Sequence, residues 1–489
     1  MEIRKKVHSM SIIFGAMVPH PPLIIPQVGK GEEAGIEDTV NAYKEVGRKV
    51  AELEPDTIVI STPHSVMYYD YFHISPGASA TGTFSRFGVS PSDWSMTVDY
   101  DEEFVQTLCG FADELSFPAG VAGERDAALD HATLIPLHFV REALPEGSAL
   151  PKVVRVGLSG MPLSYHYMLG MLIQKAALDL GRNVVYIASG DLSHKLKEDG
   201  PYGFDAAGPE YDERIMDVMG SASFGELFSF DGDFCDRAAE CGHRSFVMMA
   251  GAFDRTAVKV RKYSHEGPFG VGYGICTYEP EGPNETRNFL EQVELAKAEK
   301  MAELRANEDA YITLARLTLE SYLGRGITPS AEALHEQGLL PELPPELTGT
   351  RAGCFVSLHK EGALRGCIGT TGPTQDSLAD EIIRNAVNAA TEDPRFPRVE
   401  AHELPDLVYS VDVLSEPEDI DGPDALDVKK YGVIVSTKGF LPKRGLLLPD
   451  LAGVDTVEEQ IAIAKKKANI RDGEKVKLQR FTVERHEVK

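Results

Sequence analysis

The sequence is short of basic residues and of long apolar runs. Its 489 residues carry 49 Lys and Arg against 76 Asp and Glu, which gives a formal net charge of −27. This excess of negative charge repels phosphate backbones and anionic membrane surfaces, so neither nucleic acid nor membrane is expected as a partner. No segment approaches the run of about 18 apolar residues that a membrane-spanning helix needs.

Cysteine is also scarce. Six cysteines stand at positions 109, 235, 241, 276, 354 and 367, with no CxxC pair among them. Scattered thiols in a chain of this length are typical of a reducing compartment and exclude a disulfide scaffold. The apolar segment SIIFGAMVPHPPLIIP is interrupted by a histidine and prolines, so it does not match a secretory signal. We therefore expect a cytoplasmic location.

The length of the chain predicts two domains, because one hydrophobic core rarely serves so many residues. Over 11–282, short β-branched segments bounded by Pro, Gly or Asp alternate with helical patterns. The expected strands are IIFGAMV, TIVIST, VVRVGLS, VVYIASG and GYGICTY. This alternation predicts an α/β domain with a central, mostly parallel sheet flanked by helices.

A domain boundary is expected at the segment YEPEGPNETRNF, which holds two prolines, a glycine and several charges. A polar helix is expected to follow over 291–323, with 283–304 as the linker, and GRGITPS stops it. The remaining part, 305–489, contains strand patterns such as GCFVSLH and YGVIVST with helical segments between them. It predicts a second, smaller α+β domain.

Three histidines follow three of the predicted strands: His20 in VPHPPL, His64 in STPHS and His194 in SGDLSH. Ligands of open α/β sheets bind outside the carboxyl ends of the strands. Convergence of these histidines on one metal ion is the hypothesis, and packing or loop histidines are the alternative. The two prolines after His20 favour the metal site, because a ligand needs a backbone that does not move.

Several motifs of this region resemble the LigB-type class III extradiol dioxygenase superfamily, which includes the Memo proteins: VPHPPL, STPHS, DHATLIPL, SGDLSH and AECGHRSFVMMAGAF. The resemblance implies an Fe(II) ion held by two histidines and a carboxylate. At the matching positions it implies His20 and His64 as ligands, His194 as the acid/base residue and His131 in the pocket wall. Asp191 is expected to orient His194, or else to cap a helix beside Ser193.

The third metal ligand is where the sequence departs from the dioxygenases, which place a glutamate in a motif like HExRxW. The corresponding stretch here is ECGHRSF, and Cys241 is favoured over Glu240 because Memo proteins have a cysteine at that position. A thiolate next to activated dioxygen is prone to oxidation, so a Cys241 ligand favours the Memo interpretation. His243 and the pair His265–Glu266 are further candidates, with a polar loop as their alternative.

The segment GALRGCIGTTGP resembles the LRGCIG signature of the AMMECR family, and EIIRNAVNAATEDPRFP and GLLLPD are further matches. The family supplies no activity to carry over. Cys367 beside Arg365 in a glycine-rich turn is a candidate low-pKa thiolate, nucleophilic or redox-active. Arg384, Asp393 and Arg395 are expected in the same cleft. The alternative is a buried cysteine that serves only as a small hydrophobic residue.

Three functional hypotheses follow. The first is an Fe(II)-dependent extradiol dioxygenase acting on a catechol-like aromatic substrate. The second is a Memo-like metal-binding protein with a redox or partner-directed role and no ring cleavage; the resemblance implies a radical-SAM protein as its partner. The third makes the AMMECR-like half the working part. A homo-oligomer is expected in each case.

Overall fold

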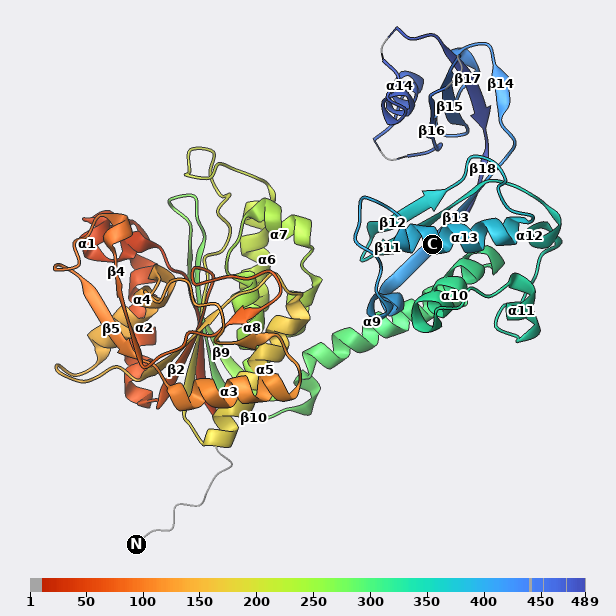
Figure 1. The fold of residues 1–489 in the computed structure, drawn as a ribbon. Helices are drawn as coiled ribbons and strands as arrows, with labels where there is room; N and C mark the ends of the chain where they lie inside the picture. The colour runs from red at the N-terminus through yellow and green to blue at the C-terminus, as the bar shows by residue number, and fades with distance from the viewer. Residues whose placement is uncertain (1–10, 439–441, 452, 472, 489) are drawn as a thin grey trace. The chain divides into compact units, whose positions relative to one another are not determined.

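The computed structural model describes residues 11–438, 442–451, 453–471 and 473–488. The chain divides into two compact units between Leu295 and Ala296. This division falls within helix α9 (Phe289–Ala306). Each unit has its own sheets and its own hydrophobic clusters, and Figure 1 traces both.

A six-stranded sheet forms the centre of the first unit, in the order β7-β2-β8-β1-β10-β9. Its strands are β1 (Ile12–Val18), β2 (Thr57–Thr62), β7 (Lys152–Gly157), β8 (Val184–Ser189), β9 (Thr256–Glu266) and β10 (Tyr273–Pro283). Strands β7, β2, β8 and β1 run parallel, β10 runs antiparallel to β1, and β9 runs antiparallel to β10. The predicted central, mostly parallel sheet is therefore confirmed.

Helices cover both faces of this sheet, as predicted (Figure 1). The helices of the unit are α1 (Pro26–Gly29), α2 (Glu37–Leu53), α3 (Glu102–Glu114), α4 (His131–Ala143), α5 (Leu163–Leu180), α6 (Ala207–Ser221), α7 (Gly232–Ala238) and α8 (His243–Ala252). Helices α2 and α4 build one hydrophobic cluster, and α3, α5, α6 and α8 build the other. Strands β2 and β8 are buried along their whole length, which explains their continuous apolar sequences.

Short strands extend the unit beyond the central sheet: β3 (Phe72–His73), β4 (Ser79–Thr83), β5 (Ser95–Asp99) and β6 (Ala119–Gly120). They pair as β3 with β6 and β4 with β5. The sequence patterns did not predict them.

The expected boundary segment overlaps the end of β10, which pairs with β9 at Pro280 and has no described partner there on its β1 side. Proline is tolerated at such a half-paired position because no ladder hydrogen bond is lost. The single helix expected over 291–323 is two helices, because the Asp309 side chain accepts hydrogen bonds from the amides of Tyr311 and Ile312 and starts a new one.

The second unit is a smaller α+β arrangement with two four-stranded sheets, in the orders β12-β11-β13-β18 and β14-β17-β15-β16. Its strands are β11 (Cys354–Lys360), β12 (Ala363–Gly369), β13 (Leu407–Leu414), β14 (Glu418–Ile420), β15 (Gly432–Thr437), β16 (Arg444–Leu447), β17 (Val476–Phe481) and β18 (Val483–Glu487). Its helices are α10 (Ala310–Arg325), α11 (Ala331–Glu336), α12 (Pro345–Gly349), α13 (Leu378–Thr391) and α14 (Val457–Lys467).

Helices α5 and α8 of the first unit approach each other closely through two glycines. A Cβ atom added at Gly251 would lie 2.0 Å from the carbonyl oxygen of Tyr167, and one added at Gly170 would lie 2.0 Å from that of Met248. These are backbone atoms, which cannot rotate away. The two glycines therefore fix the depth at which α8 sits, and with it the loop that precedes α8.

We predict that Gly251→Ala weakens the α5–α8 contact, because the new methyl group forces the two helices apart at a cost of about 1–3 kcal/mol. Faster amide hydrogen exchange in α5 and α8 of the full chain, read by mass spectrometry, is the measurement. Gly110→Ala in α3 is the matched control, since a Cβ atom there meets nothing within 4 Å. Equal exchange in both variants would contradict the prediction.

Candidate metal centre

His20 lies at the carboxyl end of β1 and is held on three sides. It is 1% exposed, its amide donates to Asp191 Oδ1 at 2.7 Å, and its Nδ1 lies 3.1 Å from Ser189 Oγ. The Tyr43 hydroxyl donates to the carbonyl oxygen of Pro19 directly before it. With Nδ1 engaged, only Nε2 faces the centre, which is how second-shell bonds orient metal-binding histidines.

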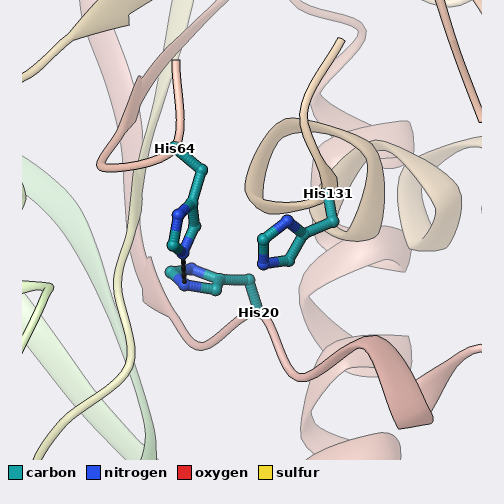
Figure 2. Close-up of side chains that lie close together, drawn as sticks. All are labelled: His20, His64 and His131. Atoms are coloured by element: carbon teal, nitrogen blue, oxygen red, sulfur yellow. Dashed lines mark hydrogen bonds between the residues drawn. The ribbon is translucent and has the colours of Figure 1, made fainter. Parts of the chain in front are cut away.

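His64 and His131 meet the His20 ring from two other elements (Figure 2). The Nε2 atoms of His64 and His20 are 3.0 Å apart, and the His131 ring lies 4.3 Å from His64 and 5.3 Å from His20, between centroids. Asp130 joins the two supporting elements: its Oδ1 accepts from Thr62 at the end of β2 and from the amide of Thr133 at the start of α4. The predicted meeting of His20 and His64 is thus seen in the structure.

Asp191 and Cys241 approach His20 from the other side. Cys241 Sγ lies 3.6 Å and Asp191 Oδ2 3.7 Å from His20 Nε2, and the Asp191 amide lies 3.3 Å from the sulfur. The loops that carry them touch at two glycines: a Cβ atom on Gly190 would lie 2.1 Å from the Cα of Gly242. Only glycine at both positions permits this contact.

The donor atoms form two groups that share His20. One is His20, His64 and His131, the other is His20, Asp191 and Cys241, and within each group the atoms lie within 4.8 Å of one another. Two nitrogen ligands at right angles on an ion about 2.1 Å away are about 3 Å apart, which fits the His20–His64 separation. Imidazole, carboxylate and thiol together suit a first-row transition ion. The residues therefore fit a metal.

Burial sets the charge states of the free side chains. It lowers the pKa of His20 well below its ordinary value and that of His131 to about 4, and it raises the pKa of Asp191 to about 7. Burial, with Asp191 and Glu240 nearby, also raises the pKa of Cys241. Near neutral pH these shifts favour uncharged His20 and His131 rings and a protonated Cys241 thiol, and a bound cation would favour the ionised forms of Asp191 and Cys241.

His194 follows β8, as predicted, and has a defined tautomer. Its Nδ1 lies 2.6 Å from the carbonyl oxygen of Ala239, which can only accept, so the proton is on Nδ1 and Nε2 is left as an acceptor. The Tyr202 ring stands edge-on to it at 5.0 Å. The backbone of Ala239, not Asp191, orients this histidine.

The expected roles of Asp191 are therefore corrected. Its carboxylate accepts from the His20 amide, and the ring of His194 is fixed elsewhere. No helix starts beside Ser193 in the described chain, so Asp191 is not a helix cap either. The reason is that the chain turns directly from β8 into an irregular loop that closes on His20.

The remaining candidates of the first unit lie in other environments. Glu240 accepts from the amide of His243 at 2.6 Å at the start of α8, and burial raises its pKa to about 7. His243 is buried against the Leu227 carbonyl, His265 pairs with Asp212 at 3.0 Å, and Glu266 accepts from Thr39. None of these four belongs to the two donor groups among the described residues.

Sequence reasoning missed four residues that support the centre. Ser189 orients the ring of His20, and Tyr43 holds the backbone directly before it. Gly190 and Gly242 bring the two loops together. Ser189 and Gly190 end the run VVYIASG and begin the SGDLSH motif, so their position at the strand end was the available signal. Tyr43 lies in the middle of an amphipathic helix and gives no such signal.

In the second unit, Cys367 is held at the edge of its sheet by Asp393 and Arg395, two of the expected cleft residues. Its amide donates to Asp393 Oδ2 at 2.9 Å, and Arg395 donates to its carbonyl oxygen at 3.3 Å. The Arg395 guanidinium also holds the pKa of Asp393 well below its usual range. Burial raises the pKa of the Cys367 thiol, against the low-pKa thiolate that the sequence suggested.

Arg365 and Arg384 do not join Cys367. Arg365 forms a two-pronged ion pair with Glu403, at 2.8 and 3.0 Å, and donates to the Pro397 carbonyl. Arg384 donates to the Thr374 hydroxyl at 3.2 Å. Within the described residues no hydrogen bond or ion pair links these arginines to Cys367. Arg365 therefore has a structural role, because its donors already bond to Glu403 and to the Pro397 carbonyl.

The family of the chain follows from comparison with known proteins. Residues 15–276 match the model described as the catalytic LigB subunit of aromatic ring-opening dioxygenase, and residues 312–487 match the AMMECR1 model. The chain therefore belongs to the LigB family through its N-terminal half and carries an AMMECR1 domain after it. Both resemblances predicted from the motifs are confirmed.

Relatives share one or both halves. A Clostridium acetobutylicum protein is 38% identical over 478 residues, which covers 96% of this chain and 98% of its own length. A Thermotoga maritima protein is 51% identical over 183 residues, 37% of this chain and 98% of its own. A solved Pyrococcus horikoshii protein is 33% identical with a TM-score of 0.31, and covers 36% of this chain and 88% of its own. In the described part of the chain, no helix is long and apolar enough to span a membrane.

We predict that Cys367 is a slow thiol. Because burial raises its pKa, the thiolate forms only above the ordinary pH range for cysteine, and its alkylation by iodoacetamide should stay below that of free cysteine at pH 7.5 and rise steeply with pH. Peptide mapping by mass spectrometry measures the rate at this position, with Cys367→Ser as the blank. Alkylation at neutral pH faster than that of free cysteine would contradict it.

Proposed function

We propose that the first unit is a metal-dependent enzyme of the extradiol dioxygenase type, which binds Fe(II) at the centre around His20 and acts on a catechol-like aromatic substrate. One observation carries the proposal: His20 and His64, 44 residues apart in the chain, bring their Nε2 atoms to 3.0 Å at the carboxyl ends of the sheet. A bound Fe(II) ion would supply Lewis-acid activation of a catechol and a site for dioxygen.

The chain's own residues divide the work. His20 is buried and bonded from behind, so it forms the fixed side of the centre, whereas His64 is exposed and lies on the side that a substrate reaches. His194 presents Nε2 as a lone pair and is positioned to accept a proton from a substrate hydroxyl. Asp191, in the same donor group as His20, is a carboxylate ligand candidate in place of Glu240.

A second candidate function is favoured by Cys241. Its sulfur lies 3.6 Å from His20 Nε2, whereas the carboxylate of Glu240 is bonded at the start of α8. A thiolate ligand is a liability beside activated dioxygen because it is oxidised itself. This arrangement supports a Memo-like metal-binding protein with a redox or partner-directed role, for which a radical-SAM protein is the proposed partner.

We predict that His64→Ala lowers Fe(II) affinity by more than about 100-fold, because loss of a ligand costs more than loss of its supporting bonds. The full chain is loaded anaerobically and its iron is measured by plasma mass spectrometry. His64 is exposed, so this variant should keep its melting temperature. Glu240→Gln is the control and should retain iron.

The same series distinguishes the two candidate functions. If the Cys241→Ser variant loses iron, the thiol is among the ligands and the Memo-like protein is favoured. If the Asp191→Asn variant loses iron while the Cys241→Ser variant keeps it, the dioxygenase is favoured. Iron bound equally by wild type, His64→Ala and His20→Ala would refute the metal centre itself.

We also predict that the iron-loaded chain consumes oxygen with a member of a catechol panel, and that His194→Ala reduces the rate by about 10²–10⁴-fold, the usual contribution of a general base. An oxygen electrode gives the rate, and mass spectrometry identifies a ring-opened product that contains both atoms of dioxygen. Wild-type protein that holds iron but consumes no oxygen with any catechol would reject ring cleavage and leave the Memo-like function.

A further inference from the structure

A fully buried arginine bonds to the loop that leads into α4. Arg155 stands in β7 and is 1% exposed. Arginine is almost never buried unless its charge is paired, because a guanidinium that leaves water loses strong hydration. It has no lone pair for a metal ion or a proton, so Arg155 acts only through the groups to which it donates.

Three of these groups lie in the short segment directly before His131. Arg155 Nη1 donates to the Ala128 carbonyl at 2.7 Å, and Nη2 donates to the Asp126 carbonyl at 3.3 Å. Nη1 also lies 3.6 Å from Asp130 Oδ2, which makes an ion pair at the residue next to His131. Arg155 therefore fixes the chain immediately before a candidate ligand.

A buried histidine holds the start of the same loop. His73 in β3 is fully buried; its Nδ1 lies 3.0 Å from the Ala122 carbonyl oxygen, and its Nε2 lies 3.1 Å from Glu124 Oε2. Arg155 Nη2 is 3.8 Å from the same carboxylate oxygen. The loop from 122 to 130 is thus bonded along its length to two buried side chains of other strands, and Arg155 contacts both of its carboxylates that face inward.

Asp130 passes this constraint to both candidate ligands. It caps α4 by accepting from the Thr133 amide at 3.0 Å, and it accepts from the Thr62 hydroxyl at 2.8 Å. Thr62 Oγ1 in turn accepts from the His64 amide at 3.2 Å. Since His131 follows Asp130 in the chain, a shift of Asp130 moves the backbone of both histidines.

We propose that Arg155 is a positioning residue of the metal centre: it fixes Asp130 and the loop before it, and through them the placement of His64 and His131. The inference rests on the proposed function and deepens it, because it assigns the support of two ligand candidates that come from different elements. The role requires the planar fork of arginine, since the point charge of a lysine ammonium cannot span the same acceptors.

The test uses Co(II) alone as the probe, added to the full chain under anaerobic conditions. The absorption spectrum of bound Co(II) depends on the number and geometry of its ligands. Arg155→Lys keeps the charge and loses the fork. Its dissociation constant for Co(II) should rise by about 10-fold, the lower end of the effect of residues that orient ligands, and its spectrum at saturating Co(II) should differ from that of wild type.

Arg182→Lys is the matched control. Arg182 pairs with Glu103 at 2.5 Å and stands just before β8, at the amino end of the parallel strands, whereas the centre lies at their carboxyl ends. This variant should keep the Co(II) affinity and the spectrum of wild type, whatever happens to its melting temperature. A merely stabilising role of Arg155 would move the melting temperature without moving the spectrum.

Ser75→Ala is a milder variant of the same network. It removes the oxygen atom that accepts from Arg155 Nε at 2.6 Å and leaves the guanidinium in place. The spectrum should change in the same direction as in Arg155→Lys, by a smaller amount. If Arg155→Lys does not fold, Ser75→Ala decides, and a wild-type affinity and spectrum in that variant would overturn the inference.

The outcomes separate this inference from the proposed function. If His64→Ala weakens Co(II) binding while Arg155→Lys binds with the affinity and spectrum of wild type, the inference is overturned and the metal centre stands. Equal changes in Arg155→Lys and Arg182→Lys would also overturn it, because the arginine would then only stabilise the fold. Co(II) bound equally by wild type and His64→Ala would overturn both.

Discussion

The contact between Gly190 and Gly242 is the constraint on which the candidate centre depends. It brings the loop after β8 against the loop before α8, so that Asp191 and Cys241 reach a histidine that ends β1. The two loops lie about 50 residues apart in the chain, and only the absence of side chains lets their backbones touch. Gly251 fixes the depth of α8 and thereby also the position of the loop before it. The geometry of the candidate donor atoms thus depends on glycines, which have no side chain that could bind a metal.

Much of the first unit could be predicted from its sequence, because buried parallel strands leave a clear signal. Five strands and the positions of His20, His64 and His194 after them followed from β-branched runs that end in small residues or proline. The hairpin partner β9 was missed because its residues alternate irregularly and stay half exposed. The role of Asp191 was missed because a hydrogen bond to an amide 171 residues away leaves no local pattern.

The second unit shows a different limit of sequence reasoning. Cys367 in LRGCIG and two residues of DPRFP were expected to lie together, and they do. The sequence, however, suggested that they form a reactive cleft. The structure shows instead that Asp393 and Arg395 bond to the two main-chain groups of Cys367 at the edge of the sheet. A motif that looks reactive in sequence can equally encode backbone bonding, and only coordinates separate the two.

That edge has a consequence for how the second unit meets other molecules. An edge strand normally offers unpaired amides and carbonyls on which a foreign strand can add itself. At Cys367 of β12 both groups are already taken by side chains of the same chain, so strand addition is blocked at the middle of the edge. A macromolecule that binds this part of the edge must therefore recognise side chains, and the exposed guanidinium of Arg395 is one of them.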